Sequence, residues 1–540
     1  MTAVTKLDDP FDFSAWPPTL SEEQLRVLVG NSSTYALSHG LLYLPPGYPL
    51  HSPPPQAAIH APLSLIPSPF PRNLFGYAQR LQGIYNVLYA RIAMDTPFLD
   101  EIMGAEKGVG RVDTFIGELW RGWKKLRDQE KLPQPHHLGL FRSDYLLHAP
   151  EGQQPSIKQV EFNTISISFG CLAQRVAELH RFQHAATSYF DSSPHLKREN
   201  FPKNESIAGL AKGLAAAHKA YVSQAPGASS QAKILFVVQP GERNVFDQKW
   251  LEYELLEKHS IHIVRQTSEE LISSAKVDDT TSILRVSPAL SPQRDIEISV
   301  VYYRSAYMPD EYPTPEHYTV RFLLESSLAI KCPTIPLQLA GGKKVQEVLG
   351  KPGIVEKFLP DFTPEQIAEL RDSFMDMWGL DENIQPSDGT SDASGTSHEP
   401  PGTTKARREY TSLVLKPQRE GGGNNVYKDD IPAFLDSLPA EEREAWIAMR
   451  LIEVPRGVRG WLLRAGSFDT SENDASNSAK HNAVEAEVVS ELGIFGWALF
   501  GQDQPLEEQE VGWLVRTKGK DSNEGGVATG FSVLDSLILV

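Results

Sequence analysis

Cysteine is the scarcest residue type in this sequence, with 2 among 540 residues. Two thiols cannot cross-link a chain of 60.0 kDa, so a disulfide scaffold is excluded and a reducing compartment is favoured. Long apolar runs are also lacking, and the longest, Leu492–Phe500, is too short to span a bilayer. Met1–Asp9 has neither the basic nor the apolar region of a signal peptide, so we expect a cytoplasmic protein without a membrane anchor.

Positive charge is in deficit, since 52 Lys and Arg stand against 69 Asp and Glu and give a net charge of -17. This balance excludes a broad surface for nucleic acid or an anionic membrane, so any anionic ligand needs a local cationic pocket. The sequence also lacks a Walker A loop, a His-Glu-x-x-His zinc helix and a Gly-x-Ser-x-Gly elbow. His180 and His184 have helical spacing but no further zinc ligands, so we expect a solvated helix face there.

What is present is the composition of a globular protein of roughly three to four domains, with 40% hydrophobic and 22% charged residues. Between Leu81 and Ile92, apolar residues recur with the spacing of one helix face. The polar segments 384–410 and 470–482 can bury little apolar surface, so we expect disordered insertions there.

Three strand-like runs follow residue 232, at Ile234–Val238, Ile261–Val264 and Ile296–Tyr303. Helical stretches separate them. Buried strands that alternate with helices predict a parallel sheet, so residues 232 to about 335 are expected to form a compact α/β unit.

The first candidate site is Ile157–Asn163. If this segment is a strand, Val160 and Phe162 lie on one face and Glu161 and Asn163 lie together on the other. Two neighbouring oxygen donors suit a hard cation such as Mg²⁺. An amphipathic edge strand with a solvated polar face is the alternative for this segment alone.

The second candidate site is Leu413–Asn425, a strand that ends in Lys416 and leads to three consecutive glycines, Gly421–Gly423. Backbone N–H groups of such glycines can surround phosphate oxygens without obstruction by side chains. Glu420 at the start of the loop could serve the metal of a nucleotide. A flexible hairpin turn is the alternative.

The third candidate site is Leu514–Lys518, where strand alternation puts Arg516 and Lys518 on one face. A guanidinium can hold a carboxylate with two hydrogen bonds, while an ammonium acts as a point charge for phosphate. The glycine-containing loop Glu524–Ala528 follows. For this strand taken alone, a solvated face is the favoured interpretation.

Eight segments of the chain together match one known family. They are Phe141–Tyr145, Glu161–Ser166, Glu242–Gln248, Tyr303–Pro309, Gln338–Val345, Leu415–Asn425, Ser490–Gly496 and Arg516–Ala528. These segments resemble the eukaryotic glutathione synthetases, a family of ATP-grasp enzymes, and point to a fungal member. They run in the family's order from about residue 140 to the C-terminus.

The resemblance implies an α/β ATP-grasp body formed by residues 1–231 and 338–540, with a lid at about 365–485. It further implies an inserted parallel-sheet substrate-binding domain at 232–337 and a homodimer. The activity it implies is the ATP-dependent ligation of γ-glutamylcysteine to glycine, with one or two Mg²⁺ ions and an acyl-phosphate intermediate. ADP and phosphate would be released.

The resemblance also implies roles for individual residues. The Mg²⁺ ligands would be Glu161, Asn163 and Glu420. The ATP site would comprise Glu161, Lys343, Lys416, Pro417, Gln418, Arg419, Glu420, Gly421, Gly422, Gly423, Asn424, Asn425, Tyr427, Met449, Arg450, Leu451, Ile452, Glu491, Lys518 and Glu524. The γ-glutamylcysteine site would comprise Arg142, Ser166, Ile167, Ser168, Glu242, Arg243, Asn244, Gln248, Arg304, Ser305, Ala306 and Tyr307. The reacting carboxyl and glycine would contact Arg142, Arg516, Val527 and Ala528, with Arg142 and Arg516 as the catalytic pair.

Three alternatives remain at the level of the sequence. The acceptor could be an amino acid other than glycine, because selection for glycine depends on the size of the space beside Val527 and Ala528, which a sequence does not give. The protein could also be a silent ATP-binding scaffold, or a phosphotransferase that stops at the acyl phosphate. Arg450 stands where relatives carry an acid, and Glu524 stands where some carry Asp.

Overall fold

The computed structural model describes residues 11–45, 58–225, 227–289, 295–382, 399–419, 423–464, 483–501, 504–522, 527 and 532–540. Five candidate site residues lie outside these ranges: Glu420, Gly421, Gly422, Glu524 and Ala528. The predicted insertion 470–482 also lies outside them. Among the described helices, none combines the length and apolarity that crossing a membrane requires.

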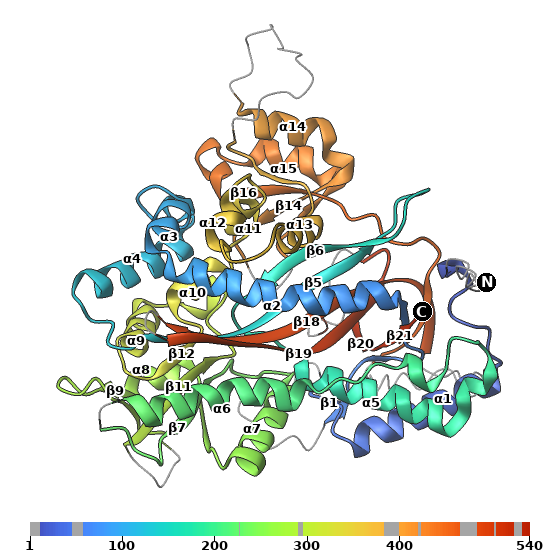
Figure 1. Ribbon diagram of the computed structural model, residues 1–540, viewed down its shortest axis with the longest axis horizontal. Helices are drawn as coiled ribbons and strands as arrows, with labels where there is room; N and C mark the ends of the chain where they lie inside the picture. The colour runs from blue at the N-terminus through green and yellow to red at the C-terminus, as the bar shows by residue number, and fades with distance from the viewer. Residues whose placement is uncertain are drawn as a thin grey trace, which may run out of the picture.

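A large mixed sheet forms the centre of the protein (Figure 1). Its three longest strands are β5 (His136–His148), β18 (Ala483–Gly501) and β19 (Gln504–Gly519). Strand β18 pairs antiparallel with both β5 and β19. The short strand β6 (Ser156–Asn163) pairs with β5, and β20 (Ser532–Asp535) pairs with β19. The sheet thereby brings residues near 142, 161, 491 and 516 onto adjacent strands.

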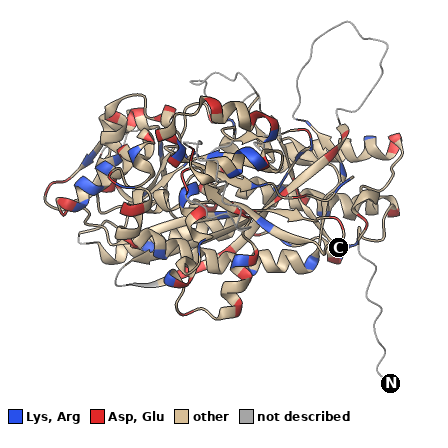
Figure 2. Ribbon diagram, turned by 90° about the horizontal axis from the view of Figure 1, so that it is seen from above, with Lys and Arg blue, Asp and Glu red and all other residues tan. Residues whose placement is uncertain are grey.

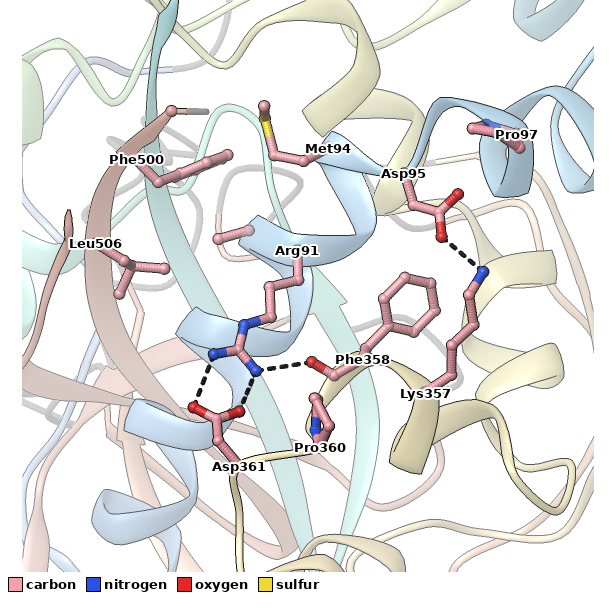
Figure 3. A pocket seen from close by; sticks show the side chains of 12 residues that line it. Arg91, Met94, Asp95, Pro97, Lys357, Phe358, Pro360, Asp361, Phe500 and Leu506 are labelled. Carbon is pink, nitrogen blue, oxygen red and sulfur yellow. Dashed lines mark hydrogen bonds and ion pairs between the residues drawn. The ribbon is translucent and has the colours of Figure 1, made fainter. Parts of the chain in front are cut away.

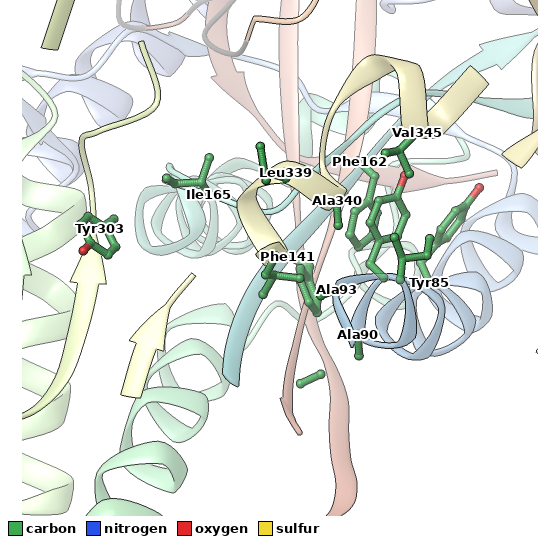
Figure 4. Packing of buried hydrophobic residues seen from close by; sticks show 14 of the residues in the cluster. Tyr85, Ala90, Ala93, Phe141, Phe162, Ile165, Tyr303, Leu339, Ala340 and Val345 are labelled. Carbon is green, nitrogen blue, oxygen red and sulfur yellow. The ribbon is translucent and has the colours of Figure 1, made fainter. Parts of the chain in front are cut away.

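Helices cover both faces of this sheet (Figure 1). Helix α2 (Arg72–Met94) packs on one face, and α5 (Gly170–Thr187) and α6 (Ser206–Gln224) pack on the other. The predicted helical stripe between Leu81 and Ile92 is confirmed, because its apolar members are buried against the sheet. Figure 4 shows Tyr85 of this helix beside Phe162 of β6.

Helix α5 differs from expectation at one position. His180 is fully buried, with Nδ1 2.6 Å from Ser536 Oγ and Nε2 2.8 Å from the Ser64 carbonyl. The predicted solvated face is therefore wrong for His180. The interior provides a partner for each ring nitrogen, so burial does not leave a polar atom unpaired.

The parallel strands predicted after residue 232 are present, and the antiparallel strands β9 (Ala275–Val277) and β10 (Leu284–Val286) join them. Strands β7 (Lys233–Val237), β8 (Ile263–Gln266), β11 (Ile296–Tyr303) and β12 (Ile330–Cys332) pair in parallel. Strand β12 also pairs with β5, so the unit shares one continuous sheet with the centre of the protein.

A separate sheet of four strands has its own small core above β6 (Figure 1). It consists of β13 (Met377–Gly379), β14 (Leu413–Pro417), β15 (Val426–Tyr427) and β16 (Trp446–Arg450). The expected disorder of 384–410 is wrong for its second part, because α14 (Pro401–Glu409) is helical. Its small residues Gly402, Thr403 and Ala406 are buried, so this helix packs closely without large apolar side chains.

The remaining elements complete these layers. The helices are α1 (Glu22–Ser38), α3 (Thr96–Ile102), α4 (Thr114–Asp128), α7 (Val245–His259), α8 (Ser268–Ser274), α9 (Pro315–Glu325), α10 (Ile335–Ala340), α11 (Lys343–Leu349), α12 (Ile354–Phe358), α13 (Pro364–Asp372) and α15 (Ile431–Ser437). The strands are β1 (Leu42–Tyr43), β2 (Ile59–His60), β3 (Leu63–Ser64), β4 (Ser68–Phe70), β9 (Ala275–Val277), β10 (Leu284–Val286), β17 (Arg459–Leu463) and β21 (Leu537–Leu539).

Candidate functional site

Strand β6 presents Glu161 and Asn163 on the face predicted for them. Phe162 points to the opposite face, where its ring stacks 3.9 Å from Tyr89. The alternation is interrupted at Val160 by an irregularity in the pairing with β5. An irregular residue leaves its carbonyl out of the ladder, and the Val160 carbonyl accepts a hydrogen bond of 2.9 Å from Lys416 Nζ.

Two lysines from distant parts of the chain meet Glu161. Lys343, the first residue of α11, has its Nζ 2.8 Å from Glu161 Oε2, and Lys416 reaches over from β14 in the small sheet. Although burial alone would raise the pKa of Glu161, these two ammonium groups hold it well below its usual range. Glu161 is therefore an ionised acceptor in a cationic setting.

A second cluster of charges lies beside the first on β5, β18 and β19. Arg142 donates to Asp144 through two nitrogens, at 2.6 Å and 2.7 Å. Arg516 of β19 donates to Asp144 at 3.2 Å and also forms an ion pair with Glu491 of β18. Glu491 and Arg516 are directly opposite in the strand register, which explains their contact. Lys518 follows two residues later on the same strand.

The other candidate ATP residues surround the small sheet. Gln418 accepts from the Lys344 backbone N–H at 3.0 Å and donates to the Ala445 carbonyl at 3.1 Å. Arg419 pairs with Asp113, and Pro417 ends β14. These contacts tie the end of β14 to α11 and α4.

The strand β16 and the glycine loop show two further features. Met449 is buried, whereas the Arg450 side chain pairs with Glu409 at 2.8 Å, and Leu451 and Ile452 follow the strand's end. Gly423 has a φ of +79°, a conformation that favours glycine. Asn424 and Asn425 follow it, and Asn425 donates to the Tyr427 hydroxyl at 3.2 Å.

The residues implied for γ-glutamylcysteine come from three segments that meet at the start of α5. Arg304 donates to the Ile167 carbonyl and lies 3.5 Å from Asp247. Asp247 in turn accepts from the backbone N–H of Phe169 at 2.8 Å. Ser166 and Ser168 flank Ile167, and Ser166 has a φ of 53°. The loop before α5 is thus held by both β11 and α7.

Glu242 organises the start of α7. It accepts from the Asn244 backbone N–H at 2.8 Å and from Gln248 at 3.3 Å. Asn244 is buried, and its side-chain amide has no hydrogen-bond partner within the described part of the chain. A buried amide without a partner is suited to a polar ligand. Arg243 is directed toward the N-terminal segment, where its Nε donates to the Leu44 carbonyl at 3.0 Å.

The segment after Arg304 is held by its own hydrogen bonds. Ser305 donates to the Val237 carbonyl at 3.1 Å, and the Ala306 carbonyl accepts from Gln338 at 3.0 Å. The Tyr307 hydroxyl accepts from Gln239 at 3.0 Å. Val527 is buried.

A surface cavity of about 720 Å³ lies elsewhere, between the end of α2 and α12 (Figure 3). Its lining includes Met94, Phe358 and Phe500, together with the ion pair of Arg91 and Asp361. None of the candidate site residues lines it. In Figure 2, basic and acidic residues are interspersed along the elements.

Sequence reasoning missed Asp144 and Asp247. Both are buried carboxylates that contact candidate site residues. Asp144 had an available signal, because it follows Arg142 by two positions on a strand and so shares its face. The sequence signal for Asp247 was weaker, because its contact with the start of α5 joins residues that are far apart in sequence.

The fold and this site define a mixed α/β protein in which buried cationic side chains gather around β5 and β6. Residues 22–539 match the model of the eukaryotic glutathione synthase ATP-binding domain. The chain belongs to the eukaryotic glutathione synthase family.

Individual members of this family are similar to the chain over nearly its whole length. The glutathione synthetase large chain of Schizosaccharomyces pombe is 34% identical over 534 residues, which cover 96% of this chain and 98% of that one. Glutathione synthetase of Rattus norvegicus is 34% identical over 526 residues, covering 97% and 99%. A solved structure of a glutathione synthetase-like effector from Globodera pallida has the same fold, with a TM-score of 0.69, 21% identity and coverage of 97% and 98%.

Proposed function

We propose that this protein joins γ-glutamylcysteine to glycine, with ATP as co-substrate, through an acyl phosphate. Membership of the family supports the ligase class and the use of ATP. The observation that carries the proposal is the meeting of Lys343, Lys416 and Glu161 from three distant segments, next to the Arg142–Asp144–Arg516 cluster.

The chemistry follows from charge. A carboxylate is a poor electrophile, so its oxygen first attacks the γ-phosphorus of ATP and ADP leaves. The amine of glycine then adds to the acyl carbon, and phosphate departs. Lys343 and Lys416 offset the negative charge on phosphate, while Arg142 and Arg516 orient the reacting carboxyl and glycine. Loss of one such donor costs about 10²- to 10³-fold in rate.

The residues present fit a divalent cation. Glu161 supplies an ionised carboxylate, and Asn163 supplies an amide on the same strand face, which are the oxygen donors that Mg²⁺ prefers. Bound there with Glu420, Mg²⁺ would neutralise charge on the transferring phosphoryl group. Glu161, Asn163 and Glu420 are the ligands we propose.

The four-stranded sheet supports the proposed ATP-grasp lid. Its core is separate from the two larger cores, and it carries Lys416, whose Nζ donates to the Val160 carbonyl of β6 at 2.9 Å. A lid that closes over the acyl phosphate would protect it from water. The proposed inserted substrate domain, 232–337, carries Glu242, Asn244 and Arg304.

The exposed apolar residues support the proposed homodimer. Of the large apolar side chains that are exposed in the described ranges, Val27 and Leu37 lie on α1, Phe182 on α5, and Tyr253 and Leu256 on α7. These helices neighbour one another on one side of the molecule (Figure 1). Apolar side chains exposed on neighbouring helices are suited to an association surface.

A three-substrate assay tests the proposed reaction. We expect the purified protein to release phosphate and form glutathione in equal amounts only when γ-glutamylcysteine, glycine, ATP and Mg²⁺ are all present. Phosphate would be measured colorimetrically and glutathione by mass spectrometry, with each component omitted in turn.

The same assay distinguishes the alternatives. Equal turnover with alanine or serine would refute selection for glycine. ADP formation that does not need glycine would indicate a phosphotransferase. Nucleotide binding without phosphate release dependent on γ-glutamylcysteine would indicate a scaffold. We also propose a cytoplasmic location, which the two free, buried cysteines support and which imaging of a fluorescent fusion would test.

A further inference from the structure

Asp144 is a fully buried carboxylate at the centre of the charged site. It receives two hydrogen bonds from Arg142, at 2.6 Å and 2.7 Å. It also receives one from Asn163 Nδ2 at 3.0 Å and one from Arg516 at 3.2 Å. Asp144 therefore contacts three residues to which the proposed function gives direct roles, while its own side chain has no access to solvent.

The hydrogen bond to Asn163 fixes the orientation of that amide. An ionised carboxylate can only accept hydrogen bonds, so the side chain of Asn163 must turn its NH₂ group toward Asp144. The Arg142 carbonyl oxygen lies 3.4 Å from Asn163 Nδ2 and is a second acceptor for the same NH₂ group. The amide oxygen of Asn163 is then directed away from Asp144 and is available to a hard cation, which takes oxygen and not NH₂.

The contacts with the two arginines have a second effect. Arg142 on β5 and Arg516 on β19, the strands on either side of β18, carry like charges and would repel each other without an anion between them. Asp144 lies between them, and its paired bonds to Nε and an NH₂ group of Arg142 set the plane of that guanidinium. The orientation of both arginines therefore depends on one buried carboxylate.

We propose that Asp144 is a positioning residue that directs the Asn163 oxygen toward the metal and orients Arg142 and Arg516 toward the substrates. This inference rests on the proposed function for the roles of those three residues. Asp144 acts through its neighbours and does not touch substrate. Outer groups that orient metal ligands typically contribute 10- to 100-fold to metal affinity.

The test compares the wild-type protein with Asp144→Asn. The probe is Mn²⁺ in the presence of a non-hydrolysable ATP analogue, followed by its EPR signal, and the KM for glycine is measured in parallel. The amide at position 144 can donate to the Asn163 oxygen and turn it inward. We expect the Kd for Mn²⁺ to rise about 10- to 100-fold and the KM for glycine to rise as well.

Two further variants separate positioning from simple destabilisation. Asp100→Asn removes a 2.9 Å ion pair with Arg127 between α3 and α4, away from the site, and should leave both values unchanged. The exchange Asp144→Asn with Asn163→Asp keeps the net charge and restores a donor–acceptor pair. It should recover the Mn²⁺ affinity, while the KM for glycine stays raised because the arginines have lost their central carboxylate.

The possible results are decisive. An Asp144→Asn protein with wild-type Mn²⁺ affinity and wild-type glycine KM would overturn the proposal, whatever its melting temperature. If that variant does not fold, the exchange variant decides, and a failure to bind Mn²⁺ there overturns the proposal equally. Binding of Mn²⁺ and the analogue needs no turnover. A wild type that makes no glutathione would thus refute the proposed function and leave the binding test interpretable.

Discussion

At the scale of single residues, buried polar groups of this protein occur on both faces of the central sheet. Behind Arg516, on the opposite face, Asp535 accepts hydrogen bonds of 2.7 Å from Ser68 and from Thr517. Ser490 joins the same cluster, 2.7 Å from Ser68. These hydroxyls link β4, β18, β19 and β20 at the level of the site.

Asp535 makes a pH dependence of stability predictable. Burial raises its pKa to about 6, although the hydrogen bonds from Thr517 and Ser68 oppose this shift. A raised pKa in the folded state means that the stabilisation is complete below the unfolded value of 3.8 and is lost as the pH rises through about 6. The variant Asp535→Asn cannot titrate there. We expect the free energy of unfolding of the wild type, relative to the variant, to fall by about 1.4 kcal/mol between pH 5 and pH 7.5.

Urea unfolding at both pH values measures this difference. Asp279→Asn, a change at an exposed aspartate, serves as the control and should show no such trend. Parallel pH curves for the wild type and Asp535→Asn would contradict the prediction.

At the scale of elements, β18 makes room for the charged cluster with a glycine. Gly493 lies opposite Asp144 in the register. A Cβ atom at this position would be 2.8 Å from Asp144 Oδ1 and 2.9 Å from Arg142 Cδ. Because both side chains are held by ion pairs in a buried setting, they cannot simply swing aside.

We therefore expect Gly493→Ala to displace the Arg142–Asp144 pair and to lower kcat/KM by about 10²-fold, the usual cost of misplacing a catalytic group by about 1 Å. Steady-state kinetics of the wild type and the variant would measure this loss in kcat/KM. Gly519→Ala on the neighbouring strand meets no atom within 4 Å and is a matched control that should keep activity. Equal activities of the two variants would show that this close approach does not matter.

At the scale of the whole molecule, the proposed homodimer predicts a particle of twice 60.0 kDa. A charged residue in an apolar interface is costly because it loses its hydration. The double variant Leu37→Glu with Tyr253→Glu should therefore be monomeric in light scattering coupled to size-exclusion chromatography. Val484→Glu, at an exposed apolar residue on β18, should stay dimeric. A monomeric wild type, or dissociation by Val484→Glu alone, would refute the interface on α1 and α7.

Local patterns predicted much of the fold. The helix at 81–92 and the parallel strands after 232 were predictable because periodicity and composition are properties of short segments. The same holds for the alternation that puts Glu161 and Asn163 on one face. Helix α14 was missed because its buried residues are small, so composition gave no apolar signal.

What the sequence by itself determined are these local conformations, the lack of a disulfide framework and the types of group available for binding anions. Only the tertiary structure decided that Lys343, Lys416 and Glu161 meet, that His180 is buried, and that Asp144 joins Arg142, Asn163 and Arg516. The physical reason is that periodicity depends on neighbours along the chain. Contacts between β5, β18 and β19 depend instead on strand register and on packing across hundreds of residues.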